Sequence, residues 1–140
     1  MADSPTIEIP LETVCFIIVK AREFDAKDIV TDPDSGSNAA DEDMMSVLED
    51  HKDDPVVAEL VGAISALSDD QQIDLVTLAW LGRGTGTVDE WDDLRSEAAD
   101  AHKRQTTPRY LLGLPLLADY LAEGLDQLGL SCEDIEADHL

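Results

Sequence analysis

Positive charge is the property that this sequence of 140 residues lacks most. Nine residues are Lys or Arg and 32 are Asp or Glu, which gives a formal net charge of −23. Such an exterior repels phosphate backbones and anionic lipids, so we expect no direct nucleic-acid partner and no membrane partner. The charge itself is most simply a source of solubility. The excess of Asp and the shortage of Lys also suit salty water, which screens self-repulsion.

Long apolar runs are missing as well. The longest, residues 14–19, falls far short of the roughly 20 residues that a membrane-spanning helix needs. Residues 1–10 combine neither a basic segment nor a long apolar stretch, so they do not resemble a signal peptide. We therefore predict a cytoplasmic protein.

Cysteine is scarce, with Cys15 and Cys132 as the whole complement. Two thiolates are too few for a four-cysteine zinc site or a disulfide framework. We expect both to be free thiols, with Cys15 packed as a small apolar residue.

Metal and cofactor signals are also missing. The histidines His51, His102 and His139 lie far apart in sequence and form no metal-binding spacing. The acidic loop around Gly36 resembles a calcium loop, but counting from Asp32 puts this glycine one position early. We predict no metal, no cofactor and no catalytic residues.

Apolar residues nevertheless make up 44% of the chain, enough for a real core. They recur at helical spacing, and no segment alternates as a strand does. We predict an all-α fold, a single-domain bundle of about five main helices plus one or two short ones. The domain spans residues 1–140, with residues 1–9 and 131–140 loosely ordered and residues 31–43 as a surface loop. The main helices are expected over residues 10–28, 55–67, 68–81, 87–101 and 115–128, with short ones near 44–48 and 109–113.

Helix ends are marked clearly in two places. Ser68 with Gln71, and Thr87 with Glu90, have the spacing of capping boxes. Between them the glycine-rich stretch 82–86 is expected to end the helix that begins after Ser68.

Several stretches resemble the bacterial family catalogued as domain of unknown function 3775. They are residues 21–28 (AREFDAKD), 75–84 (LVTLAWLGRG), the helix that contains Trp91, and 110–125 (YLLGLPLLADYLAEGL), together with the SGSN loop. The resemblance implies an all-helical fold and an alphaproteobacterial origin. It implies no activity and no site residues.

A candidate ligand site is formed by Trp80, Arg83, Trp91 and Arg109. Two arginines near flexible glycines and indoles suit bidentate binding of a carboxylate or phosphate. The competing interpretation is structural: the glycines end a helix, Arg83 interacts with its last carbonyls, and the tryptophans belong to the core.

A second candidate is an internal ion pair of Arg22 and Asp25. Asp25 shares the apolar stripe of the first helix, and a buried charge must be paired. From elsewhere in the chain, Arg83 or Arg109 is the expected partner of Asp25.

Taken together, these patterns predict a non-enzymatic protein-interaction module whose partner is another protein or a second copy of itself, as a homodimer. One alternative is a small-anion or small-ligand binder, or an enzyme, that uses the corner of Trp80, Arg83, Trp91 and Arg109. Another is an acidic mimic of nucleic acid that occupies a basic partner.

Overall fold

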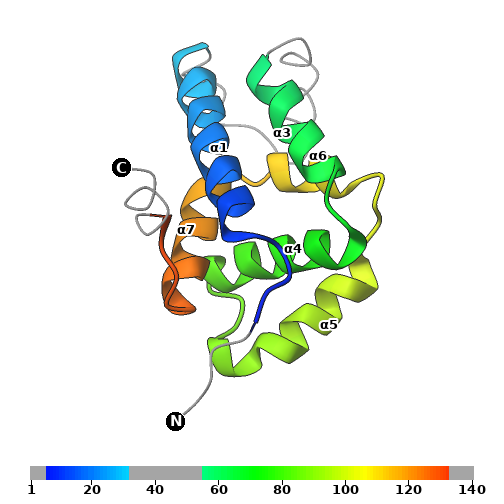
Figure 1. The fold of residues 1–140 in the computed structure, drawn as a ribbon. Helices are drawn as coiled ribbons and strands as arrows, with labels where there is room; N and C mark the ends of the chain where they lie inside the picture. Colours follow the sequence, from blue (N-terminus) through cyan, green and yellow to red (C-terminus); the bar gives the residue numbers. More distant parts are fainter. Residues whose placement is uncertain (1–5, 32–54, 133–140) are drawn as a thin grey trace.

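The protein is all-α over the residues that the structure covers. The computed structural model describes residues 6–31 and 55–132, and the side chains of residues 25–31 lie outside that description. Its helices are α1 (Leu11–Thr31), α3 (Pro55–Ser65), α4 (Asp69–Arg83), α5 (Trp91–Ala101), α6 (Thr107–Leu112) and α7 (Leu117–Gln127), with a 3₁₀ turn at Val88–Glu90 (Figure 1). No strand occurs among these residues, which confirms the predicted fold class.

Helix α4 is the centre of the bundle. Nine of its side chains are buried, from Gln72 to Leu81, so it is surrounded by the other helices. It packs most extensively against α7. Two glycines make this contact close: a Cβ atom on Gly82 of α4 would lie 1.7 Å from the carbonyl oxygen of Tyr120, and one on Gly124 of α7 would lie 2.5 Å from that of Leu78. The two backbones therefore touch where neither helix carries a side chain.

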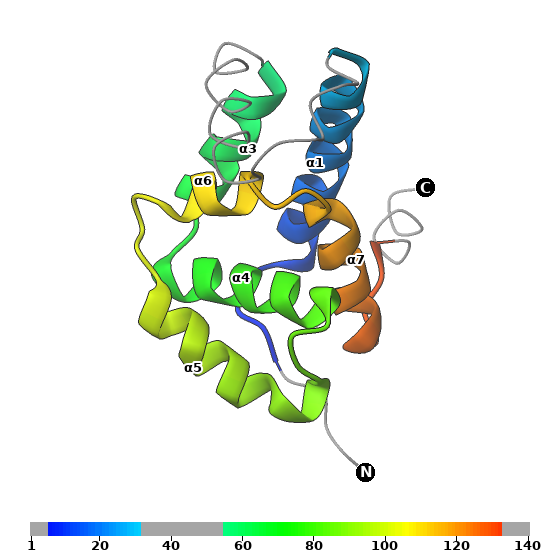
Figure 2. The same cartoon turned by 180° about the vertical axis from the view of Figure 1, so that it is seen from behind.

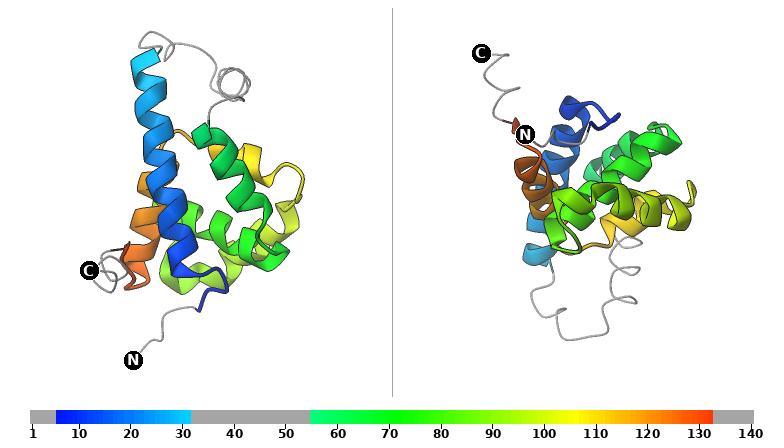
Figure 3. Two further views of the ribbon diagram at one scale, coloured as in Figure 1. Left: turned by 45° about the horizontal axis from the view of Figure 1, so that its top comes forward. Right: turned by 90° about the horizontal axis from the view of Figure 1, so that it is seen from below.

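Helices α1 and α3 lie side by side on one side of α4, and α5 runs along the other side (Figures 1 and 2). Figure 3 shows α1 as the longest element, with α7 beside it. The core is continuous across these layers and includes Val14 and Ile18 of α1, Leu60 of α3, Leu78 of α4 and Leu121 of α7.

The predicted caps of α4 are confirmed. The Ser68 hydroxyl accepts from the backbone N–H of Gln71 (3.1 Å), and the Gln71 side chain accepts from the Ser68 N–H (3.0 Å). Gly84 ends the helix with a left-handed φ of 94°, which glycine adopts without steric cost. At the second capping box, the Glu90 carboxylate accepts from the Thr87 N–H (2.9 Å). Thr87 is the N-cap of the 3₁₀ turn that precedes α5.

The chain ahead of α1 is attached to the bundle. Ile9 is buried in the core, and the backbone N–H of Glu8 donates to the carboxylate of Asp74 on α4 (2.5 Å). The expectations for residues 1–5, 32–54 and 133–140, which include a short helix near 44–48, lie outside the described residues. Loosely ordered ends and a surface loop over 31–43 therefore stay predictions.

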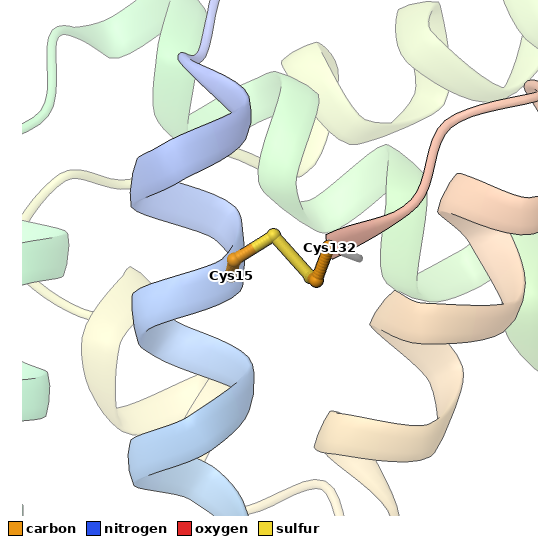
Figure 4. The surroundings of a disulfide bond; sticks show 2 residues. All are labelled: Cys15 and Cys132. Atoms are coloured by element: carbon orange, nitrogen blue, oxygen red, sulfur yellow. A yellow bond between two sulfur atoms is a disulfide. The ribbon is translucent and has the colours of Figure 1, made fainter. Parts of the chain in front are cut away.

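The expectation of two free thiols is wrong. Cys15 of α1 and Cys132, just after α7, form a disulfide with Cα atoms 5.6 Å apart (Figure 4). The two cysteines are 117 positions apart in sequence, so no local pattern pairs them. They meet because α7 packs against α1 and the chain then turns back at Gly129, whose φ is 78°.

Candidate functional site

The structure brings together two of the four residues of the predicted corner. The Arg83 guanidinium lies 5.8 Å from the centre of the Trp80 ring, a cation–π arrangement, and its Nε donates to the Thr85 hydroxyl (3.0 Å). The Trp80 Nε1–H donates to the hydroxyl of Tyr110 on α6 (2.8 Å). Trp80 therefore connects the end of α4 to α6, and Tyr110 joins this group although the sequence pattern does not single it out.

The other two residues of the corner have different surroundings. Trp91 begins α5 and is only 4% exposed, as part of the hydrophobic core. Arg109 is exposed on α6, next to Tyr110 in sequence. Anion binding by the four residues together stays a prediction.

Of the predicted pair of Arg22 and Asp25, the structure describes only the Arg22 side chain. This arginine is exposed, and its guanidinium lies 3.9 Å from the carboxylate of Asp119 on α7, a surface ion pair that links α1 to α7. The Asp25 side chain lies outside the described residues, so its partner stays a prediction.

A buried carboxylate that the sequence pattern does not single out organises the other side of α4. Asp74 is 1% exposed and accepts from Arg95 of α5 through Oδ1 (2.7 Å), while its Oδ2 accepts from the Glu8 N–H. The hydrogen bond to Asp74 is the main reason why the pKa of Arg95 is raised above its ordinary value, and it outweighs the lowering by desolvation. Arg95 also lies 3.5 Å from Asp70 and 3.9 Å from Glu8. The Arg95 guanidinium thus forms ion pairs with three carboxylates.

Two further polar groups fix the turn between α3 and α4. Arg104 donates to the carbonyl oxygens of Ser65 (3.0 Å) and Leu67 (2.7 Å), which the end of α3 leaves without helical partners. The buried Gln72 side chain donates to the Ile64 carbonyl (2.9 Å) and contacts His102 Nε2 (2.7 Å) through its oxygen. These contacts hold one end of α3 against α4 and α5.

A surface groove of about 530 Å³ lies between α1 and α3. Its lining combines residues of α1 and the segment before it with residues of α3, the following turn and the start of α4: Pro10, Glu12, Thr13, Phe16, Ala63, Ala66, Leu67 and Gln71. Phe16 is 40% exposed there, an unusual position for an aromatic side chain. The groove is therefore mainly apolar and is open to solvent.

Lys20 lies one helical turn beyond Phe16 on α1. Its ammonium lies 5.8 Å from the centre of the Phe16 ring and 3.2 Å from the carboxylate of Glu59 on α3, so an ion pair joins the two helices. Glu23 lies 3.7 Å from the same ammonium. The hydrogen bond to Glu59 is the main cause that raises the pKa of Lys20, and desolvation opposes it. Lys20 stays charged at neutral pH.

The exposed face of α3 carries little charge. Among the 11 residues of α3 one is charged, Glu59. Helix α5 has the same length and carries five: Asp92, Asp93, Arg95, Glu97 and Asp100. Yet α3 is far from fully buried, because Val61 is 37% exposed and Ala58, Gly62, Ser65 and the adjoining Ala66 are exposed as well. In a chain of net charge −23, this α3 face with Glu59 as its single charge is an exception that solubility does not explain.

The described side chains offer no constellation for metal chemistry: none of their His, Cys, Asp and Glu residues gather in threes that could hold an ion. Within the same part of the chain, each helix is too short or too polar to span a bilayer.

An all-α protein with an acidic exterior and an apolar groove between two helices is the class that these observations define. The chain belongs to the family described as "Protein of unknown function (DUF3775)", whose model matches residues 57–130. This confirms the resemblance found in the sequence. The match covers nearly all of α3 and continues through α7, whereas α1 and both cysteines lie outside it. No curated protein and no solved structure matches the chain significantly.

Proposed function

We propose that this chain is a non-enzymatic protein-interaction module, folded as one helical domain over residues 1–140. The observation that supports the proposal is the α3 face beside the groove, which carries a single charge, Glu59. Contiguous exposed apolar surface is typical of protein interaction sites, and here the rest of the chain is strongly acidic.

The polar contacts around α4 support a structural role for the groups that make them. In the described part of the chain, Asp74 and Arg95 are bound to each other, and Gln72 and His102 are likewise in mutual contact. These groups connect helices and hold the α3–α4 turn in place.

The small-anion alternative has one specific observation in its favour. Arg22, Arg95 and Arg104 each lie within 4.0 Å of a carboxylate, whereas among the described residues Arg83 and Arg109 have none at that distance. Arg83 on Trp80 therefore keeps donors for an anion. A thermal shift with phosphate, sulfate or acetate that disappears in Arg83→Gln would support this function, and no shift with any of them would exclude it.

Capture from a lysate of the native host tests the interaction module. Ala66→Arg places a bulky cation in the groove, and Ala99→Arg makes the same change of charge at an exposed alanine of α5. We expect a protein that binds the wild type and Ala99→Arg and is lost with Ala66→Arg. Light scattering at micromolar concentrations tests self-association by the same variants. If Ala66→Arg changes neither capture nor mass, the proposal fails.

The proposed location is the cytoplasm, and the disulfide bears on it directly. Cytosolic thiols are kept reduced, and disulfides there are rare and usually transient. Alkylation of Cys15 and Cys132 immediately on lysis of host cells measures the state of the pair. A largely alkylated pair supports the cytoplasm, and a fully protected pair means an oxidising compartment.

A further inference from the structure

We propose that the groove between α1 and α3 binds an amphipathic helix of a basic protein partner. The apolar side of that helix enters the groove, and its Lys and Arg residues meet the carboxylates at the two ends. This inference rests on the proposed function and adds the chemistry and secondary structure of the partner.

The shape of the site favours a helix. A groove between two helices accepts the ridge of side chains of a third, and helix-in-groove binding is a common way to recognise an amphipathic segment. The α3 side of the groove is lined by the small residues Ala63 and Ala66. The neighbouring Gly62 leaves further space, because a Cβ atom there would meet nothing within 4 Å. A partner backbone can therefore come close to α3. Strand addition needs a free sheet edge, and residues 6–31 and 55–132 contain no strand.

The charges at both ends of the groove favour a basic partner. Beyond the Phe16 end of the groove, Glu23 and Glu59 share the single cation of Lys20. At the other, Glu12 lines the groove, and Gln71, also in the lining, is bonded to the carbonyl of Glu8 (3.4 Å). Both ends therefore keep negative charge beside an apolar centre. Glu12 and Glu23 are 11 residues apart on α1, roughly 16 Å at the helical rise, or about three turns of a partner helix.

The Glu8 end is more negative than Glu12 alone indicates. The Glu8 carboxylate shares Arg95 with Asp70 and Asp74, so three negative charges meet one positive charge there. Cations of a partner that lie over this end gain favourable Coulomb energy, and this gain falls as salt screens it.

A second copy of the chain fits the same surface less well. A two-fold dimer through this groove places one patch against itself, so that Glu12, Glu23 and Glu59 lie near carboxylates of the other copy. Each copy also carries a net charge of −23. Repulsion between like charges opposes this dimer, whereas the same charges attract a basic segment.

The test uses a fluorescently labelled peptide of about 14 residues, long enough for nearly four helical turns. It carries leucine at helical spacing on one side and lysine elsewhere, and a scrambled peptide of the same composition is the control. Fluorescence anisotropy measures binding to the full chain. We expect Ala66→Arg to weaken binding of the amphipathic peptide about tenfold or more, and the matched Ala99→Arg to change it less than about twofold.

A second pair of variants separates the groove from general attraction by charge. Glu12→Gln with Glu59→Gln neutralises one carboxylate in the groove lining and one just beyond its Phe16 end. Glu97→Gln with Asp100→Asn neutralises two carboxylates on exposed positions of α5. We expect the first pair to weaken binding clearly more than the second. Equal losses for both pairs, or equal affinity for the scrambled peptide, overturn the proposal in favour of nonspecific attraction.

The remaining outcomes distinguish this inference from the proposed function. If the peptide does not bind and light scattering shows a dimer that Ala66→Arg dissociates, the occupant is a second copy, and only the basic helix is refuted. If a captured partner depends on Ala66 but the peptide does not bind, the module stands and its partner has another chemistry. If neither a peptide, a partner nor a dimer depends on Ala66, both proposals fail.

Discussion

A Cβ atom on Gly82 would lie 1.7 Å from the carbonyl oxygen of Tyr120. Helices α4 and α7 can therefore cross this closely only with glycine at position 82. Gly82→Ala must push the two backbones apart, so we expect the free energy of unfolding to fall by about 3 kcal/mol or more. Urea denaturation followed by circular dichroism measures this change.

Gly62 provides the opposite case in α3. It is a helical glycine with open space around its missing Cβ, so alanine meets no obstacle there. We expect Gly62→Ala to raise the free energy of unfolding by about 0.5–1 kcal/mol, because alanine has the higher helix propensity and restricts the unfolded chain. A loss of stability at position 62, or none at position 82, would contradict this difference between the two backbone environments.

Asp74 should be the most sensitive acidic residue among those described. Asp74→Ala leaves the Arg95 guanidinium and the Glu8 N–H without their buried acceptor. We expect a loss of about 2–3 kcal/mol, somewhat below that for a fully buried pair because Arg95 is partly exposed. Asp69→Ala removes the exposed pair with Arg104 and should cost about 1 kcal/mol or less. Thermal denaturation of both variants checks the ranking.

Reduction of the disulfide should destabilise the fold without removing it. The bond closes a loop of 117 residues, for which the chain-entropy model gives an upper figure of about 5 kcal/mol. We expect the melting temperature to fall in dithiothreitol, and Cys15→Ala with Cys132→Ala to match the reduced protein. Because the core also joins many aliphatic side chains of α1, α3, α4 and α7, the helical circular dichroism should persist at about 25 °C. An unchanged melting temperature would mean that the two thiols are unpaired in solution.

Tyr110→Phe removes the acceptor of the Trp80 indole. Both side chains are partly exposed, so water replaces the lost hydrogen bond and the expected cost is only about 0.5 kcal/mol. Nitrogen–proton NMR gives the sharper measurement. The Trp80 indole signal should move to lower proton shift, while that of the buried Trp91 should stay. Equal shifts of both signals would mean that the variant disturbs the core rather than this contact.

Local patterns predict most of the helices because their causes are local. The Ser68 hydroxyl and the Gln71 amide are three residues apart, and Gly84 adopts its left-handed φ within a single residue. Gly82 shows the limit of such patterns. Its sequence context assigns it to the glycine stretch that ends α4, yet the helix continues through it, and its role depends on a backbone some 40 positions further along the chain.

The candidate sites are harder to predict because they join distant segments. Asp74 lies in an apolar stretch, a signal that it must be paired, but nothing in the sequence indicates Arg95 on another helix as its partner. The sequence does show that α3 has only one charged residue, Glu59, and this scarcity of charge could have indicated its exposed face as a candidate site. The choice of Trp91 rests on closeness in sequence to the glycines, whereas its side chain packs in the core.

The bond between Cys15 and Cys132 makes a covalent ring of nearly the whole chain. A protease that cuts once anywhere inside this ring produces two fragments that remain tethered by sulfur. Such a nicked molecule keeps the mass of the intact chain plus one water and separates into pieces only after a reductant is added. Even if the backbone between α1 and α3 is cut, the disulfide thus keeps the two walls of the groove in one molecule.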